Sequence, residues 1–414
     1  MTSQKIAWVG TGGSSGITLN AIEDRIAEIR GDVGFTFIDT QPFNLRTGGL
    51  TTYRGRGKIR LASRGGCGMR SWTRSWSANM LLNGGPRMYR KLVRYCEELL
   101  SMGPDVLVMC HDRIYVETAM IAAARRMCVP TVLIQEGPFC NIGDGQAQSH
   151  ALQLKAAIAP VVTAAGLLPP IPKYGCAGHD LLIAASESYR DRWIAVGVPE
   201  DRIRVCGIPR YDSLARARTL AGGALPKGER LRILYVVQPF AAHGKVDRGA
   251  AKSVLEMMAV ALNQAAELFP IELIVRSHPR SNGDDIAALR QGLKIPLTDD
   301  RGGRSIEEAI VGADVIVGHY SSAILETLMI GKGAICIPIP KAAFAEAAEA
   351  EKQIWLTRIG LPVVTNAAEL ERALAEARQR SLPPINWDLI RDELGIVDGE
   401  ATSRCAEAIL KLVE

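Results

Sequence analysis

Short apolar runs alternate with longer segments of helical periodicity along the chain. In the first half, the apolar runs predict strands, and the segments between them have the spacing of half-buried helices. We expect strands at 5–9, 34–38, 105–110, 131–135, 181–184 and 204–206, and helices at 17–29, 87–102, 116–127 and 187–196. This alternation is typical of a parallel sheet covered by helices.

A second series of the same kind begins after a break rich in glycine and alanine at 221–228. We expect strands at 232–237, 272–276, 314–317 and 334–337, helices at 250–268, 305–311 and 323–330, and a final helix at 401–413. A chain of 414 residues is too long for one ordinary core. We therefore predict an α/β protein with two Rossmann-like domains that face each other across a cleft. An N-terminal acceptor-binding domain would span 1–220 and a C-terminal donor-binding domain 221–395, and a helix within 396–414 would pack back on the first.

Composition excludes several other classes of protein. No apolar run approaches the roughly 20 residues that span a bilayer, and the first residues lack the features of a signal peptide, so we expect a cytoplasmic protein. The nine cysteines form no Cys-x-x-Cys pair and the six histidines no cluster. Neither a disulfide framework nor a zinc site is indicated.

The net charge of +5 is unevenly distributed. No Asp or Glu occurs at 40–96, a glycine-rich segment that also contains Trp72 and Trp76, and we expect much of it to form a mobile or functional loop. Such a segment attracts phosphates, acidic sugars or an anionic membrane surface. Its basic residues are Arg46, Arg54, Arg56, Lys58, Arg60, Arg64, Arg70, Arg74, Arg87, Arg90, Lys91 and Arg94.

One motif follows a predicted strand of the second domain. Arg276, His278 and Arg280 come at the end of that strand, and Pro279 stops it from continuing. Ligands bind at the carboxyl edge of a parallel sheet, and an imidazole there bonds a phosphate oxygen or gives it a proton. A basic surface loop is the alternative interpretation.

A second motif joins a later strand to a helix. Ser321 and Ser322 lie where the helix begins, and their hydroxyls with the free N–H groups of the first turn form an anion site. Glu326 lies one turn further along and is placed to accept bonds from ribose hydroxyls. A simple serine N-cap is the alternative.

A third motif lies in the first domain, where Glu136 follows a buried strand directly. A carboxylate at this edge suits a general base. His111, at the end of the preceding strand, is a rival for the same role, and a structural salt bridge is the alternative for Glu136.

Together these motifs resemble the GT-B glycosyltransferases that use CMP-activated sialic or Kdo-type sugars, including polysialyltransferases and capsule transferases. The second domain is also similar to the CDP-glycerol glycerophosphotransferases. The resemblance implies that Glu136 is the base, that His278 contacts the donor phosphate, and that the two serines hold it. Gln135 departs from the acidic residue that the family has before the base. The matching segments are Gln135-Glu136-Gly137, His278-Pro279 and Ser321-Ser322.

The expected function is therefore transfer of a sialic-, Kdo-like or related sugar from a CMP- or CDP-linked donor to an anionic glycan or lipid-linked acceptor, in capsule or surface polysaccharide synthesis. Neither a metal nor a cofactor is expected, because fixed donors would stabilise the leaving phosphate. The basic segment suggests contact with the inner face of the cytoplasmic membrane. The acceptor-side candidates are Gly12, Gly13, His111, Arg54, Arg56, Arg70 and Arg74.

Three alternatives stay open. A nucleotide-sugar 2-epimerase has this architecture and needs no acceptor. An NAD-dependent oxidoreductase is suggested by Gly10, Gly12 and Gly13 after the first strand and Asp39 after the second, although Ser15 stands where the fingerprint has its third glycine. A nucleic-acid-binding protein is disfavoured, because the sequence contains no recognised nucleic-acid module.

Overall fold

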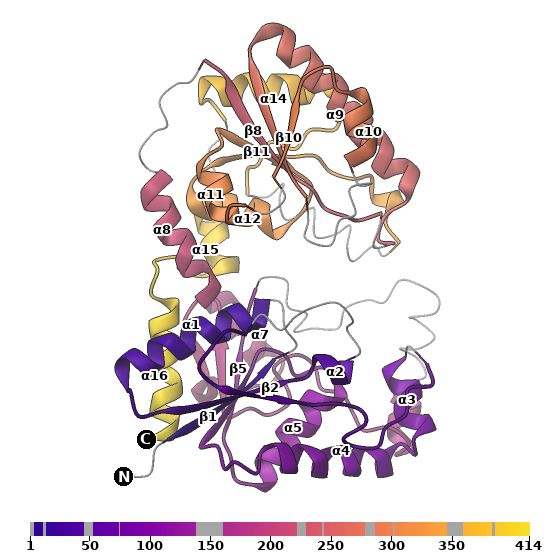
Figure 1. Cartoon of the computed structure of the whole chain (residues 1–414), viewed down its shortest axis with the longest axis vertical. Helices are drawn as coiled ribbons and strands as arrows, with labels where there is room; N and C mark the ends of the chain where they lie inside the picture. Colours follow the sequence, from indigo (N-terminus) through magenta and orange to yellow (C-terminus); the bar gives the residue numbers. More distant parts are fainter. Residues whose placement is uncertain are drawn as a thin grey trace. The chain divides into compact units, whose positions relative to one another are not determined.

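The computed structural model describes residues 4–10, 14–44, 53–73, 75–137, 160–221, 229–241, 244–277, 286–300, 303–345, 359–382 and 386–414 (Figure 1). Contacts divide the chain into two units. Unit 1 comprises Met1–Gly145, Leu154–Asp212 and Arg391–Glu414, and unit 2 comprises Gln146–Gln153 and Ser213–Ile390.

Unit 1 is built on a seven-stranded parallel sheet with the order β3-β2-β1-β4-β5-β6-β7. The four residues of β4, β5 and β6 are all buried, as expected for strands covered on both faces. Strand order reverses between β1 and β4, so the ends of these strands form the topological switch point where ligands bind in such sheets. The strands are β1 (Lys5–Gly10), β2 (Gly34–Asp39), β3 (Lys58–Leu61), β4 (Val106–Met109), β5 (Thr131–Ile134), β6 (Leu181–Ala184) and β7 (Ile203–Val205).

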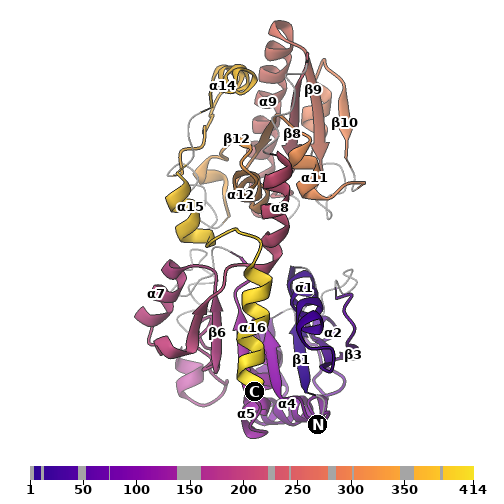
Figure 2. The same cartoon turned by 90° about the vertical axis from the view of Figure 1, so that its left-hand side faces the viewer.

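Helices cover this sheet, and the C-terminal helix α16 packs beside α1 (Figure 2). Cys405, Ala406 and Ile409 of α16 share one buried cluster with Ile22 and Ile26 of α1. Each of the three isoleucines contributes about 1.5–3 kcal/mol when removed from water. The helices are α1 (Ser14–Ile29), α2 (Gln41–Asn44), α3 (Trp76–Leu82), α4 (Pro86–Leu99), α5 (Tyr115–Arg126), α7 (Glu187–Ala195) and α16 (Ala401–Val413).

Unit 2 has a five-stranded parallel sheet with the order β10-β9-β8-β11-β12, and its switch point lies between β8 and β11. The strands are β8 (Leu231–Val236), β9 (Ile271–Arg276), β10 (Leu297–Asp299), β11 (Val315–Gly318) and β12 (Gly333–Cys336). The helices are α9 (Arg248–Leu268), α10 (Ala287–Gly292), α11 (Ile306–Val311), α12 (Ser322–Ile330) and α14 (Ala367–Gln379). Two further helices, α8 (Asp212–Ala221) and α15 (Trp387–Leu394), contain the points where the chain passes between the units.

These sheets confirm the predicted α/β class with two Rossmann-like domains. The chain enters unit 2 after Asp212, before the sequence-based boundary at 220, and returns to unit 1 at Arg391. The facing arrangement across a cleft stays a prediction.

The basic segment is more ordered than the sequence predicts. Its described part contains α2, the edge strand β3 and α3, where a loop was expected. Asn79 of α3 holds the preceding segment, since its side-chain oxygen accepts bonds of 2.9 Å from the backbone N–H groups of Trp72 and Thr73. The expectation that much of the segment forms a loop was therefore wrong for 41–44, 58–61 and 76–82. Within the described residues, no helix is both long and apolar enough to cross a bilayer.

Candidate functional site

Two groups that can carry a proton meet at the carboxyl edge of unit 1. His111 follows β4 and Glu136 follows β5, the neighbouring strand. The Nε2 atom of His111 lies 3.4 Å from Oε2 of Glu136, with the imidazole half exposed at 48% and the carboxylate buried at 8%. The two residues that the sequence offers as rival bases therefore form one pair.

The surroundings fix the position of Glu136. Burial first, and then the charge and hydrogen bond of Glu136, raise the pKa of the Cys110 thiol well above its usual range. The guanidinium Nε of Arg210 donates to the backbone oxygen of Glu136 over 2.9 Å. Neither Cys110 nor Arg210 is singled out by the sequence, although Cys110 comes directly after β4.

Gln135 braces the strand on which Glu136 stands. Its side-chain oxygen accepts from the backbone N–H of Ala185, and its side-chain nitrogen donates to the oxygen of Gly137, both over 3.0 Å. The residue that departs from the family pattern thus links the ends of β5 and β6. An amide supplies both the acceptor and the donor that this position uses, whereas a carboxylate only accepts.

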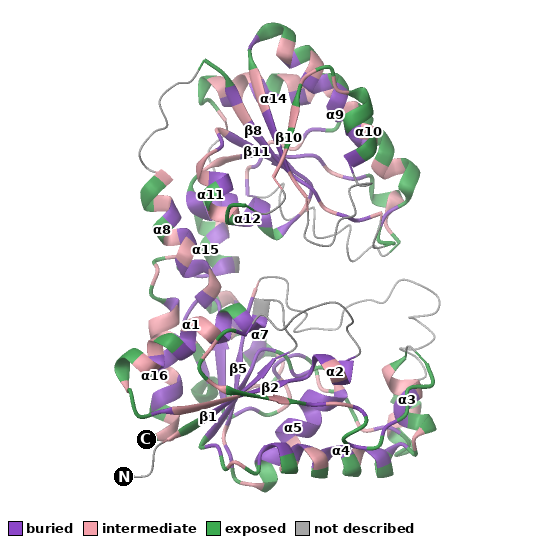
Figure 3. Ribbon diagram, viewed as in Figure 1, coloured by how far each residue is buried: buried purple, intermediate pink, exposed green. Residues whose placement is uncertain are grey.

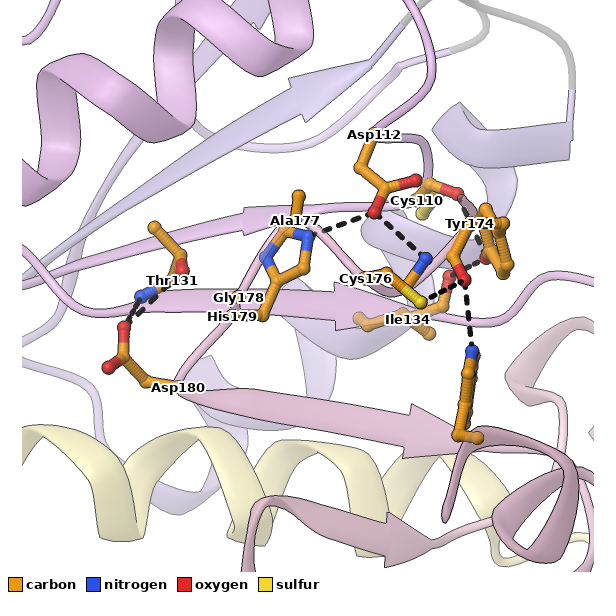
Figure 4. A network of polar contacts seen from close by, with 12 residues as sticks. Cys110, Asp112, Thr131, Ile134, Tyr174, Cys176, Ala177, Gly178, His179 and Asp180 are labelled. Atoms are coloured by element: carbon orange, nitrogen blue, oxygen red, sulfur yellow. Dashed lines mark hydrogen bonds and ion pairs between the residues drawn. The ribbon is translucent and has the colours of Figure 1, made fainter. Parts of the chain in front are cut away.

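A buried network supports the same edge (Figure 4). Asp112 Oδ2 accepts from the backbone N–H of Gly175 over 2.9 Å and lies 3.3 Å from Nε2 of His179, and both side chains are fully buried. The Tyr174 hydroxyl donates to the backbone oxygen of Cys110 over 3.3 Å. Gly175 has φ +78°, and a Cβ there would collide with the indole of Trp193, so only glycine fits this turn. The network joins 174–180 to the residues that carry His111.

In unit 2, the serine pair lies at the start of α12. Ser321 is buried and caps the helix, because its Oγ accepts from the backbone N–H of Ile324 over 3.4 Å, whereas Ser322 is exposed. Glu326 is buried within the helix. Ser321 is thus an N-cap, as the alternative interpretation holds. Its hydroxyl bonds a single N–H group, and the other N–H groups at the start of the helix can still bind an anion.

A buried histidine that the sequence did not single out follows β11 directly. Nδ1 of His319 lies 2.8 Å from the carbonyl oxygen of Ile337, which only accepts, so this nitrogen carries the proton. Nε2 then accepts from the hydroxyl of Tyr235 over 2.9 Å. Burial lowers the pKa of His319, although the bond to Ile337 opposes the shift, and the ring is held neutral.

A cavity of about 350 Å³ opens beside this histidine. Its walls come from the residues after β8 and β11, which is the switch point of the sheet, and from α9 and α10. Its polar and aromatic lining includes Gln238, Phe240, Arg248, Lys252 and His319. A second cavity of about 630 Å³ adjoins α9 and the residues after β12, with Lys341, Ser253 and Thr365 among its polar groups. We favour the first as a ligand site because it lies at the switch point and carries two cations.

The histidine–proline motif is placed only in part. Arg276 forms an ion pair with Asp300, Nη1 to Oδ2 over 3.0 Å, and donates to the backbone oxygen of Arg304 over 2.9 Å. His278, Pro279 and Arg280 lie outside the described residues. The predicted meeting of His278 with the serine pair therefore stays a prediction.

Two of the acceptor-side candidates, Arg54 and Arg56, lie away from His111. Arg54 and Arg56 precede β3 and lie against α1, through a backbone bond to Asn20 and a 3.8 Å ion pair with Asp24, respectively. They are thus near the amino end of β3, whereas His111 and Glu136 are at the carboxyl edge. The backbone of Arg70 is bonded to Asn83 at the end of α3. Gly12, Gly13 and Arg74 lie outside the described residues.

Asp39 is the acidic residue on which the NAD-dependent oxidoreductase alternative rests. In the structure it bonds the backbone two residues further along the chain. Its Oδ1 accepts from the backbone N–H of Gln41 over 2.9 Å at the start of α2. Burial raises the pKa of Asp39, although this bond opposes the shift.

Comparison with known proteins bears on the fold. No family model matches the sequence, and no curated protein matches it. The UDP-GlcNAc 2-epimerase from Methanocaldococcus jannaschii superimposes with a TM-score of 0.59 at 14% identity, over 99% of this chain and all of that one. The UDP-GlcNAc 2-epimerase from Neisseria meningitidis, bound to UDP-GlcNAc, gives 0.53 at 11% identity, over 99% and 100%. The wall teichoic acid polymerase TagF gives 0.51 at 13% identity, over 100% and 89%.

The chain has the GT-B fold. The prediction of glycosyltransfer from a CMP- or CDP-linked sugar is wrong on this comparison, because epimerases recur among the similar structures and share the length of the chain. The motifs on which that prediction rested are each two or three residues long, too short to distinguish transfer from epimerisation.

Proposed function

We propose that this protein is a nucleotide-sugar 2-epimerase that acts on a UDP-linked N-acetylhexosamine. The observation that carries the proposal is full-length similarity to solved UDP-GlcNAc 2-epimerases, together with a proton-carrying pair at the carboxyl edge of unit 1. The epimerase was among the alternatives that the sequence left open.

Inversion at C2 of a sugar requires that the C2–H bond break and that a proton return on the opposite face. Such a reaction uses groups that accept and donate protons near neutral pH. Glu136 and His111 supply a carboxylate and an imidazole within 3.4 Å of each other. In this proposal Glu136 takes the C2 proton while the C1–O bond to UDP breaks, so that the electron pair of the C2–H bond forms a C1=C2 double bond and UDP leaves. A proton from solvent then adds to C2 on the opposite face, and UDP or water adds to C1. His111, the more exposed partner, passes the proton on Glu136 to solvent.

Unit 2 would hold the nucleotide. The 350 Å³ cavity at its switch point offers an aromatic face in Phe240, an amide in Gln238 and two cations in Arg248 and Lys252. This volume is within the range of small-molecule sites. The N-terminus of α12 would attract the phosphates through its free N–H groups and dipole.

No metal or organic cofactor is part of this proposal. Proton transfer by carboxylate and imidazole groups needs none. Within the described residues, no three His, Cys, Asp or Glu side chains group as metal ligands.

The test is incubation of the purified protein with UDP-GlcNAc and no acceptor, with the products separated by anion-exchange chromatography and identified by NMR. Appearance of the C2 epimer, still linked to UDP or released with UDP, supports the proposal. Parallel incubations with CMP- and CDP-linked compounds define the nucleotide. Unchanged UDP-GlcNAc, under conditions in which the protein demonstrably binds it, would refute the proposal.

A further inference from the structure

The outer face of α4 is a row of positive charge. Arg87, Arg90, Lys91 and Arg94 are all exposed, and their spacing of three and four residues puts them on one side of the helix. Figure 3 shows exposed stretches along α4 in green. The opposite side of α4 is buried in the core of unit 1. Like charges at this spacing destabilise a helix, so the row is retained at a cost to stability.

Carboxylates do not neutralise this row in the described part of the chain. The first acids of the helix, Glu97 and Glu98, come in its last turn, and Glu97 pairs with Arg126 of α5 over 3.0 Å. No ion pair joins Arg87, Arg90, Lys91 or Arg94 to any described acid. The charge is therefore available to an external anion.

Exposed apolar side chains border the same helix. Leu81 and Leu82 end α3, just before the turn into α4, and are 39% and 62% exposed. Trp72 is 59% exposed. Leu167 is 52% exposed and lies at this turn, since a Cβ added to Gly85 would collide with the backbone oxygen of Leu167. Exposed apolar side chains on the segment that leads into a row of unpaired cations indicate an interaction surface.

The surface is built on a fixed scaffold. Asn79 bonds the backbone of Trp72 and Thr73, and Asn83 both accepts from and donates to the backbone of Arg70, over 2.9 and 2.8 Å. These bonds hold 70–73 against α3. The backbone that carries Trp72 is therefore held on α3, the helix that leads into α4.

Trp76 does not belong to this surface. Its ring stacks on Phe43 with centroids 5.6 Å apart, and the guanidinium of Arg64 covers it at 4.2 Å. Of the two tryptophans that the sequence offered for an interface, Trp72 is the more exposed, and Trp76 is only partly accessible.

We propose that Arg87, Arg90, Lys91, Arg94, Trp72, Leu81 and Leu82, together the α4 surface, dock the protein on an anionic lipid bilayer. The cations attract acidic headgroups, and the leucines and tryptophan insert at the headgroup boundary. A nucleic acid or an acidic protein would use the charges but would leave the exposed leucines without a partner. Each Lys or Arg near an anionic membrane strengthens binding about fivefold, which corresponds to about 1 kcal/mol. This inference does not depend on the proposed epimerase activity.

Co-sedimentation with lipid vesicles tests the proposal. The full chain should bind phosphatidylcholine vesicles that contain phosphatidylglycerol and should bind pure phosphatidylcholine much less. Arg90→Glu with Lys91→Glu should weaken binding at least about tenfold. The matched control is Arg372→Glu with Lys411→Glu, two exposed helical positions elsewhere, which makes the same change in net charge. Circular dichroism checks that all variants fold.

A second variant separates the apolar contribution. Leu81→Ser with Leu82→Ser should leave the attraction at low salt but abolish the binding that persists when salt screens the charges. Equal binding to neutral and anionic vesicles would overturn the proposal, and so would equal loss in the charge-reversal variant and its control. Binding to heparin or RNA without binding to anionic vesicles would also overturn it and would assign the α4 surface to another polyanion.

Discussion

His111 and Glu136 stand at the carboxyl ends of adjacent parallel strands, with Nε2 of the imidazole 3.4 Å from Oε2 of the carboxylate. Partial exposure of the histidine gives the pair access to solvent, while burial of the glutamate keeps the carboxylate in place. Glu136 can therefore exchange a proton with solvent through His111, which suits a reaction that removes a proton from the substrate and later returns one.

Replacing Glu136 tests this relationship. Glu136→Gln keeps the shape of the side chain but removes the base, so we expect the rate of C2 inversion to fall by about 10²–10⁴-fold. The affinity for UDP, measured by calorimetry, should stay nearly unchanged. Asp105→Asn, at an exposed acid before β4, is the matched control and should keep its activity. Full activity in Glu136→Gln would exclude the carboxylate as the base.

The cavity at the switch point of unit 2 should recognise the nucleotide. Phe240→Ala removes its aromatic face, and we expect affinity for UDP to fall roughly tenfold, as for loss of one aromatic contact. The upward shift of the unfolding temperature by UDP should shrink accordingly. Val260→Ala, at an exposed site on α9, serves as the control. An unchanged shift in Phe240→Ala would place the nucleotide elsewhere.

The buried pair of Asp112 and His179 should be important for stability. Asp112→Ala leaves His179 and the N–H of Gly175 without their partner, and we expect unfolding to become easier by about 3–5 kcal/mol. Asp180→Ala removes an exposed acid that bonds the N–H of Thr131 over 2.8 Å, and should cost about 1 kcal/mol. Denaturant unfolding of both variants measures the difference. Similar losses of unfolding free energy in the two variants would show that burial of the Asp112–His179 pair adds nothing to the stability.

Burial of neutral His319 predicts a dependence of local stability on pH. Burial lowers the pKa of His319 in the folded protein, whereas the unfolded chain titrates near 6.5. Below about pH 6.5 the unfolded chain takes up a proton that the folded one refuses, so stability is present above this pH and is lost as the pH falls, by up to about 1.4 kcal/mol per pH unit. Hydrogen exchange of the β8 and β11 amides should show this slope, and His319→Gln should reduce it. An equal slope in both proteins would contradict the assignment.

The sequence predicts the central strands because each is marked by its own run of neighbouring apolar residues. β4, β6 and β11 are continuous apolar runs, and β5 is apolar after Thr131, as expected for strands buried on both faces. The edge strand β3 contains Lys58 and Arg60 and is largely exposed, so no apolar run marks it. β10 is another edge strand, of three partly exposed residues. Edge strands need little apolar surface, and their pairing is decided by the fold.

The sequence predicts those residues of the candidate site that directly follow a predicted strand. Glu136 and His111 follow apolar runs, so their common edge follows from the sequence, but their contact does not. Asp112 and His179 are 67 residues apart, and nothing local indicates that they meet. His319 directly follows β11, yet its burial and its bond to Tyr235 depend on the neighbouring strand β8.

The most direct test of the proposed function follows UDP-GlcNAc by proton NMR in deuterated water, with the protein and no other substrate. Epimerisation breaks the C2–H bond, so the account predicts deuterium at C2 and growth of the signals of the C2 epimer, both lost in Glu136→Gln. Binding of UDP-GlcNAc without deuterium uptake or epimer, or turnover that begins only when an acceptor is added, would contradict it.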